Sequence, residues 1–498
     1  MSEKFDIIVV GAGPAGNAAA YTLAKAGLSV LQIERGEYPG SKNVQGAILY
    51  ADALERLIPD FRDSAPLERH VIEQRMWVLD DHSYIGGHYR SAEFAQPPHN
   101  RYTIIRARFD KWFSDQVQKA GALLLCETTV KALLRDARGK VIGVEVDRED
   151  GQIFADAVIL ADGANSLVAT RAGLRQDIRA ETVALAVKEV IFLPKETVEA
   201  RFNLGDREGV VIEMLGSITH GMVGTGFLYT NKDSISIGIG CMLSDLRRQH
   251  LAPVELLERM KAHPAIAPLI AGGEAREYAA HLIPEGGYDA LPQLYGEGWM
   301  LVGDSAGFVN AVHREGSNLA MTTGQMAAET LIELFRVGRP ATAANLARYR
   351  ARLDASFVMK DLKKYRRLPD TLDRQRQFIN DYPALLNQAA HTLLRVDGVD
   401  KRHKEKEIFA AFRERRSLLG LLGDAYHLWR ATRGEPHVIQ CPGAGRGKSS
   451  ISTVIGSTPA DRTSRSKMPT FVRLAARPSN ASSAVRPVAA AASRAASA

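Results

Sequence analysis

The chain has 498 residues, 45% of them hydrophobic and 24% charged, which is ordinary for a globular enzyme of two or three domains. The formal charge of +7 belongs to segment 434–498, with nine Lys or Arg and two Asp or Glu, so it does not argue for nucleic-acid binding. The sequence has no apolar run of roughly 18 residues and no apolar N-terminal segment, so we expect neither a membrane span nor a signal peptide.

The first predicted elements are a strand, a glycine-rich turn and a helix. The β-branched run Ile7–Val10 enters GAGPAG, a small-residue helix follows, and a second strand ends at Glu34. This is G-x-G-x-x-G in the context that dinucleotide sites require. Gly11 allows the tight turn, Gly13 lets a pyrophosphate approach the backbone, and Gly16 lets helix and strand pack closely. The segment predicts a dinucleotide site, with the helix N-terminus facing the phosphates and Glu34 facing ribose hydroxyls, and leaves FAD and NAD both open.

Residues 51–100 give mixed signals, and the periodic pattern resumes after them. A strand at about 104 leads into a helix that ends near Ala120, with Phe109, Trp112 and Phe113 at helical spacing. The strands predicted next are 123–125, 129–134 and 141–146, the last two joined by a turn at 136–139.

Two later strands also end in an acidic turn. Residues 156–160 run into Ala161-Asp162-Gly163, and residues 299–302 run into Gly303-Asp304, followed by a helical pattern over 318–335. A strand, a Gly-Asp turn and a helix far from the N-terminus suit a long dinucleotide such as FAD. The Asp304 carboxylate can bind ribitol hydroxyls, and the next helix start can face the flavin ring. The three segments together favour one non-covalent FAD over NAD.

The rest of the chain divides by pattern and charge. Residues 184–296 contain alternating strands and a helix from about Pro253, which predicts an antiparallel-sheet domain. Residues 341–433 look helical and basic, either as solvated helix faces or as a surface for an acidic protein or anionic lipid. The predicted domains are 1–183 with 297–340 for FAD, 184–296 for the sheet, 341–433 for the helices, and a disordered tail at 434–498.

Cysteine content limits the redox chemistry. The chain has three cysteines, Cys126, Cys241 and Cys441, and no C-x-x-C pair. A cubane iron–sulfur cluster usually takes four thiolates, so we expect no cluster and no other metal in this chain.

The order of these motifs resembles a known superfamily. GAGPAG, RARFDKW at 106–112, ADG at 161–163 and GDSAG at 303–307 resemble the FAD-dependent monooxygenases and reductases of the glutathione-reductase type. Within it, 38–50 and 302–329 resemble the FixC family, the flavoproteins of nitrogen-fixation electron-transfer complexes. That family is related to electron-transfer-flavoprotein:quinone oxidoreductases, and the resemblance covers about residues 4–433.

The resemblance implies an α/β fold class: a glutathione-reductase-type FAD-binding Rossmann domain, an inserted antiparallel-sheet domain for substrate or quinone, and a helical C-terminal region. It also implies a cytoplasmic enzyme, peripherally membrane-associated, that accepts electrons from a two-subunit electron-transfer flavoprotein of the FixA/FixB type and reduces quinone. In such complexes a separate ferredoxin-like iron–sulfur protein takes part, and NADH oxidation drives one electron uphill to ferredoxin or flavodoxin. No nucleic acid is implied.

The resemblance places segment 313–318 beside the flavin, where no catalytic residue is assigned and His313, Glu315 and Gly316 are flavin-adjacent candidates. His313 is a possible proton donor, with a structural hydrogen-bonding role as the alternative. Arg108 is a candidate for FAD phosphate or ribose, and a surface salt bridge is equally compatible with its position. The cofactor-binding candidates are Gly11, Gly13, Ala15, Gly16, Glu34, Arg35, Lys42, Asn43, Arg108, Val130, Asp162, Gly163, Gly303, Asp304, Gly316, Ser317 and Asn318.

Two other functions use the same scaffold. A prenyl-lipid (geranylgeranyl) reductase or a monooxygenase would need a substrate tunnel in the second domain. A non-catalytic FAD-bound subunit would not be reduced by any donor.

Overall fold

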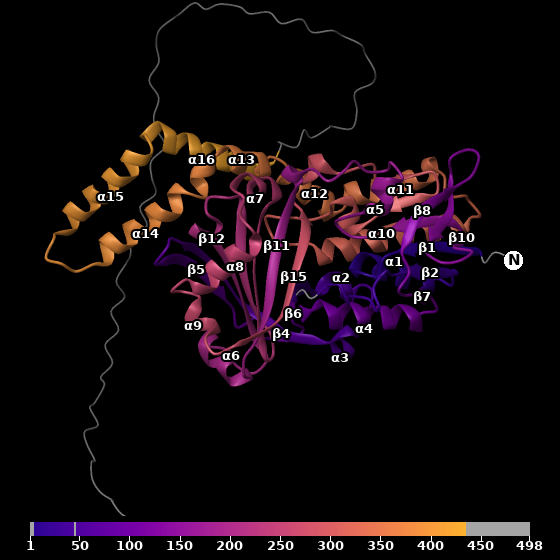
Figure 1. Cartoon of the computed structure of the whole chain (residues 1–498), viewed down its shortest axis with the longest axis horizontal. Helices are drawn as coiled ribbons and strands as arrows, with labels where there is room; N and C mark the ends of the chain where they lie inside the picture. The colour runs from indigo at the N-terminus through magenta and orange to yellow at the C-terminus, as the bar shows by residue number, and fades with distance from the viewer. Residues whose placement is uncertain (1–3, 44–45, 435–498) are drawn as a thin grey trace, which may run out of the picture. The chain divides into compact units, whose positions relative to one another are not determined.

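Two β-sheets organise residues 4–43 and 46–434, the part of the chain that the computed structural model describes. The tail predicted to be disordered, 434–498, lies outside these residues apart from Gly434. Figure 1 shows the first sheet with its helices at one end of the fold and the long strands of the second sheet beside it.

The first sheet is parallel at its centre, in the order β16-β17-β10-β1-β2-β7. Strand β1 (Lys4–Val10) is covered on both faces, and its unbroken run of β-branched residues is typical of such a position. Its two neighbours, β2 (Val30–Ile33) and β10 (Gln152–Leu160), both run parallel to it. The other strands are β7 (Leu123–Leu125), β8 (Val130–Arg135), β9 (Val141–Val146), β16 (Tyr295–Gly296) and β17 (Trp299–Leu301), and they confirm the strands predicted from 123 to 146.

Small residues bring the two main helices of this sheet together. Helix α1 (Pro14–Lys25) packs on α10 (Ser317–Arg336), and a Cβ placed on Gly324 would lie 2.2 Å from the carbonyl oxygen of Ala15. Helix α4 (Arg106–Lys119) packs on the other side of α1. The first turn of α1 is therefore held between two helices and directly above the end of β1.

The second sheet has the order β15-β11-β14-β13-β12-β4-β6-β3, with β5 beside β4. Its domain boundaries differ from the prediction, because residues 46–105, expected in the FAD-binding domain, supply four of its strands. It is also not purely antiparallel, since β12 and β4 run parallel. The strands are β3 (Gly46–Tyr50), β4 (Leu67–Leu79), β5 (Tyr84–Arg90), β6 (Arg101–Ile105), β11 (Val183–Phe192), β12 (Glu208–Gly216), β13 (Gly224–Thr230), β14 (Ser234–Met242) and β15 (Glu274–Pro284).

Helices cover one face of the second sheet, and the other face points toward the first sheet. Leu256, Leu257 and Met260 of α8 (Pro253–Ala262) join a core formed by alternate residues of the strands, and α8 confirms the helix predicted from Pro253. The opposite face of β11 and β15 lines a cavity between the sheets. Short helices fill the connections: α2 (Ala51–Glu55), α3 (Phe61–Ser64), α5 (Leu167–Arg171), α6 (Lys195–Phe202), α7 (Leu243–Gln249) and α9 (Ala267–Ile270).

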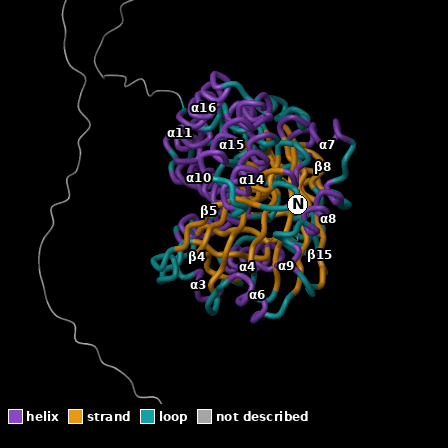
Figure 2. The backbone as a smooth tube through the Cα atoms, turned by 90° about the vertical axis from the view of Figure 1, so that its left-hand side faces the viewer, coloured by secondary structure: helices purple, strands orange, loops and turns teal. Residues whose placement is uncertain are grey.

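The C-terminal region is helical, as predicted. Helices α14 (Asp381–Leu394) and α15 (Lys401–Arg415) form a hairpin that projects beyond the sheets in Figure 1, and Figure 2 shows the C-terminal helices gathered over one side of the strands. The Asp424 side chain holds this region together, because it accepts from Gln377 (2.8 Å), the Tyr382 hydroxyl (2.5 Å) and Arg416. The helices are α11 (Ala343–Ala355), α12 (Phe357–Lys364), α13 (Leu368–Arg374), α14 (Asp381–Leu394), α15 (Lys401–Arg415) and α16 (Leu418–Arg433). Among the described residues, no helix is both long and apolar enough to span a bilayer.

Candidate functional site

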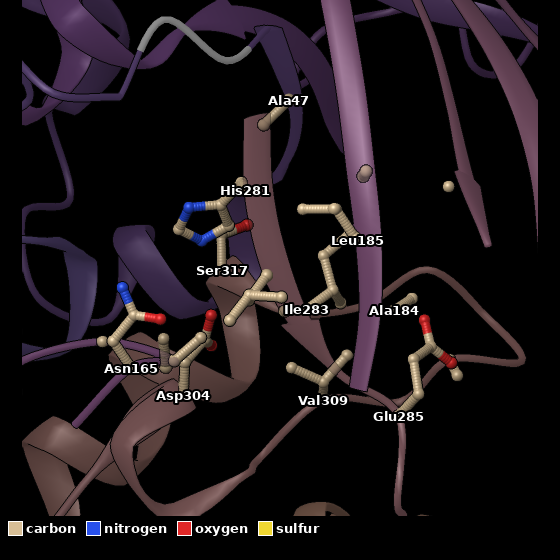
Figure 3. A pocket seen from close by; sticks show the side chains of 18 of the residues that line it. Ala47, Asn165, Ala184, Leu185, His281, Ile283, Glu285, Asp304, Val309 and Ser317 are labelled. Atoms are coloured by element: carbon tan, nitrogen blue, oxygen red, sulfur yellow. The ribbon is translucent and has the colours of Figure 1, made fainter. Parts of the chain in front are cut away.

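A cavity of about 1390 Å³ lies between the two sheets. The loops after β1, β2, β10 and β17 line one side of it, which is the edge where parallel strands end and where open α/β sheets bind ligands. Strands β11, β13 and β15 line the other side. Figure 3 shows Asp304 and His281, from opposite walls, lying in this one space.

The glycine loop leaves an open approach to the start of α1. Gly13 is the N-cap of α1, no side chain caps the helix, and its first turn carries no acidic residue. A Cβ on Gly13 would meet nothing closer than Nη2 of Arg106, at 3.9 Å, so Gly13 borders open space. Gly11 and Gly16 instead allow close packing, since a Cβ there would lie 2.3 Å from the Ala161 oxygen or 2.0 Å from the Gly11 oxygen. The free N–H groups of α1 are therefore presented to an anion.

A buried amide network beneath this loop escaped the sequence analysis. Asn17 donates to the carbonyls of Ala12 (3.1 Å) and Asp110 (3.2 Å), while Gln32 donates to the Gly11 carbonyl (3.2 Å) and to the Asn17 side chain (2.9 Å). The two amides fix the loop carbonyls and tie α1 to α4. The signal for them was present, because polar residues at fully buried positions of a strand and a helix need a partner.

Glu34, the residue predicted to face ribose hydroxyls, lines the cavity at the end of β2. Its Oε2 accepts from the N–H of Ala12 at 3.0 Å and its Oε1 from the N–H of Gly36 at 2.7 Å. The carboxylate is thus oriented by two backbone groups, and each of its oxygens keeps lone-pair capacity for a ribose hydroxyl.

The arginine at the start of α4 that faces the cavity is Arg106, and not Arg108 as predicted. Arg106 forms a bidentate pair with Asp110, with Nε–Oδ1 and Nη2–Oδ2 distances of 2.8 and 2.7 Å, and lines the cavity. The Arg108 side chain is 63% exposed, and its Nη1 lies 3.6 Å from Oε1 of Glu68. Arg108 therefore forms the surface salt bridge that was the alternative to FAD binding. Two residues along a helix correspond to a turn of about 200°, which places the two side chains on opposite faces.

The two acidic turns behave differently. Asp162 accepts from Ser166 Oγ (3.0 Å) and from the N–H of Val168 (3.1 Å), so it stabilises the start of α5 while lining the cavity. Asp304 faces the cavity, and its burial raises the pKa of its carboxyl group, with Arg106 and Arg175 acting in the opposite direction. Asp304 is therefore the carboxylate positioned for hydroxyls of a ligand.

Segment 313–318 comes only partly to the cavity. Arg314, Glu315, Gly316 and Ser317 line it, and Gly316 is the N-cap of α10 with no side-chain cap and open space where its Cβ would be. His313 is not part of the lining, and its Nε2 lies 2.8 Å from the Tyr365 hydroxyl. That contact favours the structural role for His313 over proton donation into the cavity. Asn318 is buried outside the lining.

The remaining candidates divide by location. Gly16 and Gly303 lie outside the lining at packing positions, where a Cβ on Gly303 would approach the Cβ of Ala15 to 2.8 Å. The buried Oδ1 of Asn43 has no hydrogen-bond partner among the described residues, which is what a polar ligand would supply. The open starts of α1 and α10, this unsatisfied oxygen and the Asp304 carboxylate fit the phosphates and hydroxyls of FAD. The candidates that line the cavity besides those above are Ala15, Arg35, Lys42, Val130 and Gly163.

Comparison with known proteins also indicates that the chain binds FAD. Residues 4–203 match a model described as an FAD binding domain, and residues 368–433 match the ETF-QO/FixC family C-terminal domain. Protein FixC of Azotobacter vinelandii is 64% identical over 431 residues, which cover 86% of this chain and 100% of that protein. The chain belongs to the FixC family. Protein FixC of Escherichia coli strain K12 is more distant, at 40% identity over 82% of this chain and 95% of that protein.

Membership in the FixC family makes the chain an FAD-dependent electron-transfer oxidoreductase and confirms the predicted fold class. A solved structure of a geranylgeranyl bacteriochlorophyll reductase-like protein from Thermoplasma acidophilum has a TM-score of 0.63 at 21% identity, covering 86% of this chain and 99% of that one. At that identity the similarity concerns the fold alone.

Proposed function

We propose that this FixC-family chain accepts electrons from a two-subunit electron-transfer flavoprotein and passes them to a quinone bound beside the FAD. A relative in Escherichia coli strain K12, 40% identical over 424 residues that cover 85% of this chain and 97% of that protein, is named probable electron transfer flavoprotein-quinone oxidoreductase YdiS. FAD supplies the redox chemistry when bound, and the chain positions it and shapes the second ligand's space.

The observation that carries the proposal is an apolar extension of the cavity. Its volume of about 1390 Å³ exceeds the roughly 300–1,000 Å³ typical of one small-molecule site. Besides the charged Glu213, Arg248, Asp370 and Asp373, the lining from the second-sheet domain and the C-terminal helices includes hydrophobic side chains, which suit a quinone ring and its isoprenoid tail. They come from the second sheet and from the C-terminal helices: Leu215, Val223, Phe227, Met242, Leu368, Leu372, Phe378, Ile379 and Leu428.

A substitution among these hydrophobic residues should separate the two half-reactions, which are FAD reduction by the partner flavoprotein and quinone reduction by FAD. Leu372→Trp on α13 should lower quinone reduction by about tenfold, because the larger ring occupies quinone space, while FAD content and FAD reduction stay near those of the parent. The assay supplies NADH, the partner flavoprotein and a quinone analogue and follows quinone absorbance. If quinone stays oxidised in the parent while the FAD turns over with a prenyl-lipid substrate, the chain is the lipid reductase instead.

The partner proteins follow from the family resemblance. We place the iron–sulfur centre in a separate ferredoxin-like protein, since the chain has three cysteines and a cubane cluster usually takes four. In the assembled complex, NADH oxidation would drive one electron toward quinone and one uphill to ferredoxin or flavodoxin for nitrogen fixation.

The same proposal includes a peripheral contact with the cytoplasmic membrane surface, and α16 is the element suited to it. Leu422, Tyr426 and Trp429 are 68%, 53% and 51% exposed and share one helix face at spacings of four and three residues. The exposed Arg430 and Arg433 lie in the last turn of the helix, and Leu428 on α16 lines the cavity. A basic helix with exposed aromatic and leucine side chains is typical of elements that lie in the interface of a bilayer.

Leu422→Glu should therefore weaken binding to vesicles that contain anionic lipid by about tenfold, because it places a charge on the apolar face. Co-sedimentation with such vesicles measures the bound fraction, and raising the salt concentration should lower it for the parent. Val337→Glu is the matched control, since Val337 is also exposed (63%) but follows α10, away from α16. Equal binding of both variants and the parent would contradict the assignment of α16.

A further inference from the structure

We infer that Glu213, on β12 of the second sheet, gives a proton to the quinone oxygen while the quinone is reduced. The inference rests on the proposed function and adds a catalytic residue to it. The electrons for the reduction come from reduced FAD, but the quinol product also needs protons. No motif of the sequence indicates which residue delivers them.

Strand register places Glu213 in the cavity wall among apolar side chains. Glu213 lies opposite Phe227 in the antiparallel pair β12–β13 and opposite Met76 in the parallel pair β12–β4, and all three residues line the cavity. Directly opposite residues of an antiparallel pair hold their Cβ atoms about 5 Å apart. The next residue, Met214, belongs to the core on the other face of the sheet, whereas Leu215 lines the cavity again. This alternation confirms the side to which the Glu213 side chain points.

Contacts on the same sheet face connect β12 and β13 with the loop that precedes α10. The rings of Phe227 and Tyr229 stack with their centroids 4.8 Å apart, and Tyr50 of β3 packs in the same hydrophobic cluster. The Tyr50 hydroxyl donates to the carbonyl oxygen of His313 at 3.3 Å, and the following residue, Arg314, lines the cavity. This part of the second sheet therefore meets the chain just before α10, where the flavin ring is expected.

The surroundings of Glu213 favour the protonated form of its carboxyl group. Burial is the largest influence and raises its pKa, while the positive charges of Arg314, His313 and Arg101 act in the opposite direction. Among the residues that the structure describes, none forms a hydrogen bond or a close ion pair with this carboxyl group. A carboxyl group whose pKa is raised by apolar surroundings is suited to general acid catalysis.

The proton from Glu213 balances the reduction. Two electrons and one proton reach the quinone from anionic reduced FAD, and the second proton comes from the carboxyl group. The O–H bond of Glu213 breaks as an O–H bond of the quinol forms, which leaves a carboxylate beside oxidised FAD. Water then returns a proton to the carboxylate, since the directly opposite Met76 is 40% exposed and water can reach the wall at this point.

The test compares Glu213→Gln and Glu213→Asp with two further variants. Glu145→Gln removes an exposed carboxyl group of β9 in the first sheet. Glu285→Gln removes another cavity-lining carboxyl group whose pKa is raised by burial, and Figure 3 shows it beside Ala184 and Val309. Each FAD-loaded protein is reduced with stoichiometric dithionite and mixed with a short-chain ubiquinone or with ferrocenium. Ferrocenium accepts an electron without a proton, so it reports electron transfer alone.

Glu213→Gln should lower the rate constant of quinone reduction by about 100-fold, as expected for the loss of a general acid. Its ferrocenium reduction, its FAD content and its dissociation constant for the quinone should stay near those of the parent. Glu213→Asp keeps an acid at a shorter reach and should retain part of the quinone rate. Glu145→Gln should react with both acceptors as the parent does.

Three results would overturn the inference. The first is a parental quinone rate in Glu213→Gln, and the second is an equal loss with ferrocenium, which would show that the residue supports the flavin or the fold. The third is a loss confined to Glu285→Gln, which would assign the proton to that residue. A parent that reduces ferrocenium but not quinone would instead contradict the proposed function, and the inference with it.

The pH dependence of quinone reduction has a defined sign. Glu213 donates only in its acid form, so the parental rate should fall as pH rises through its raised pKa. Glu213→Gln should remove this fall, whereas Glu213→Asp and Glu285→Gln should keep it. The other charged or titratable groups around this place come from β3, β6, β13 and the loop before α10, and they are Tyr50, Arg101, Tyr229, His313, Arg314 and Glu315.

The neighbouring groups are unchanged in Glu213→Gln, so a fall in rate that they cause would persist in that variant. Burial raises the pKa of Tyr50 to about 12 and also raises that of Tyr229, so both phenols keep their protons near neutral pH. Persistence of the full alkaline fall in Glu213→Gln would therefore assign the proton to another group and contradict the inference.

Discussion

Gly13→Val should reduce the FAD content of the purified chain to roughly a tenth of the parent or less, while the chain still folds. The new side chain has room in the protein, because a Cβ at this position meets only the Arg106 guanidinium, at 3.9 Å. It occupies instead the space through which a pyrophosphate reaches the N–H groups of α1. Since Gly13 is the N-cap of α1 and Val caps poorly, the stability loss should stay near 1 kcal/mol.

The measurement is flavin absorbance relative to protein absorbance, together with urea unfolding of the FAD-stripped proteins. Gly16→Ala serves as the contrast, because its Cβ would lie 2.0 Å from the Gly11 oxygen and must distort the loop itself. Gly16→Ala should therefore lose both FAD and stability. Normal FAD content in Gly13→Val would show that the phosphates do not bind at this loop.

Gly324→Ala should destabilise the chain by about 3 kcal/mol, the upper end of the usual cost of overpacking. A Cβ on Gly324 would lie 2.2 Å from the carbonyl oxygen and 3.0 Å from the carbonyl carbon of Ala15. These are backbone atoms of the first turn of α1, so the clash is relieved only if α10 moves away from α1. The displacement would disturb the open starts of both helices, and FAD affinity should fall as well.

Urea unfolding of the stripped protein gives the free energy, and Gly423→Ala provides the matched control. Gly423 lies in α16 with no other atom within 4 Å of its ideal Cβ, so the same substitution should stabilise that helix by up to about 1 kcal/mol. Two Gly→Ala changes in helices thus have opposite expected signs. A neutral result at Gly324 would mean that α1 and α10 are not in the close contact described above.

The site residues that belong to one strand–turn–helix segment could be predicted, because each such segment determines its own geometry. Gly11, Gly13 and Asp304 lie where the motif spacing put them, since a strand end and a helix start determine their neighbours. For Arg108, FAD contact and a surface salt bridge were both open, and the structure shows the salt bridge. Arg106 was missed because the residue that faces the cavity depends on where α4 begins, and helix boundaries are poorly specified by local sequence.

Residues that reach the cavity through strand pairing between distant segments could not be predicted in this way. The place of His281 in the cavity lining, for example, appears only when β11 and β15 are paired in register. The same holds for segment 46–105, which joins the rest of the second sheet through β4, paired with β12 more than 100 residues further along the chain. Pairing over such distances depends on the whole fold and not on propensity.

The interleaving of the two sheets has a consequence for how the chain is made. The first sheet receives β17 only at residues 299–301, after all the strands of the second sheet, and α10 follows at 317–336. Strand β10 therefore lacks its neighbour β17, and the first sheet lacks the helix α10, until well over half of the chain has emerged from the ribosome. FAD loading becomes a late event in biosynthesis, and a chain that stalls before residue 336 exposes apolar strand edges that favour aggregation.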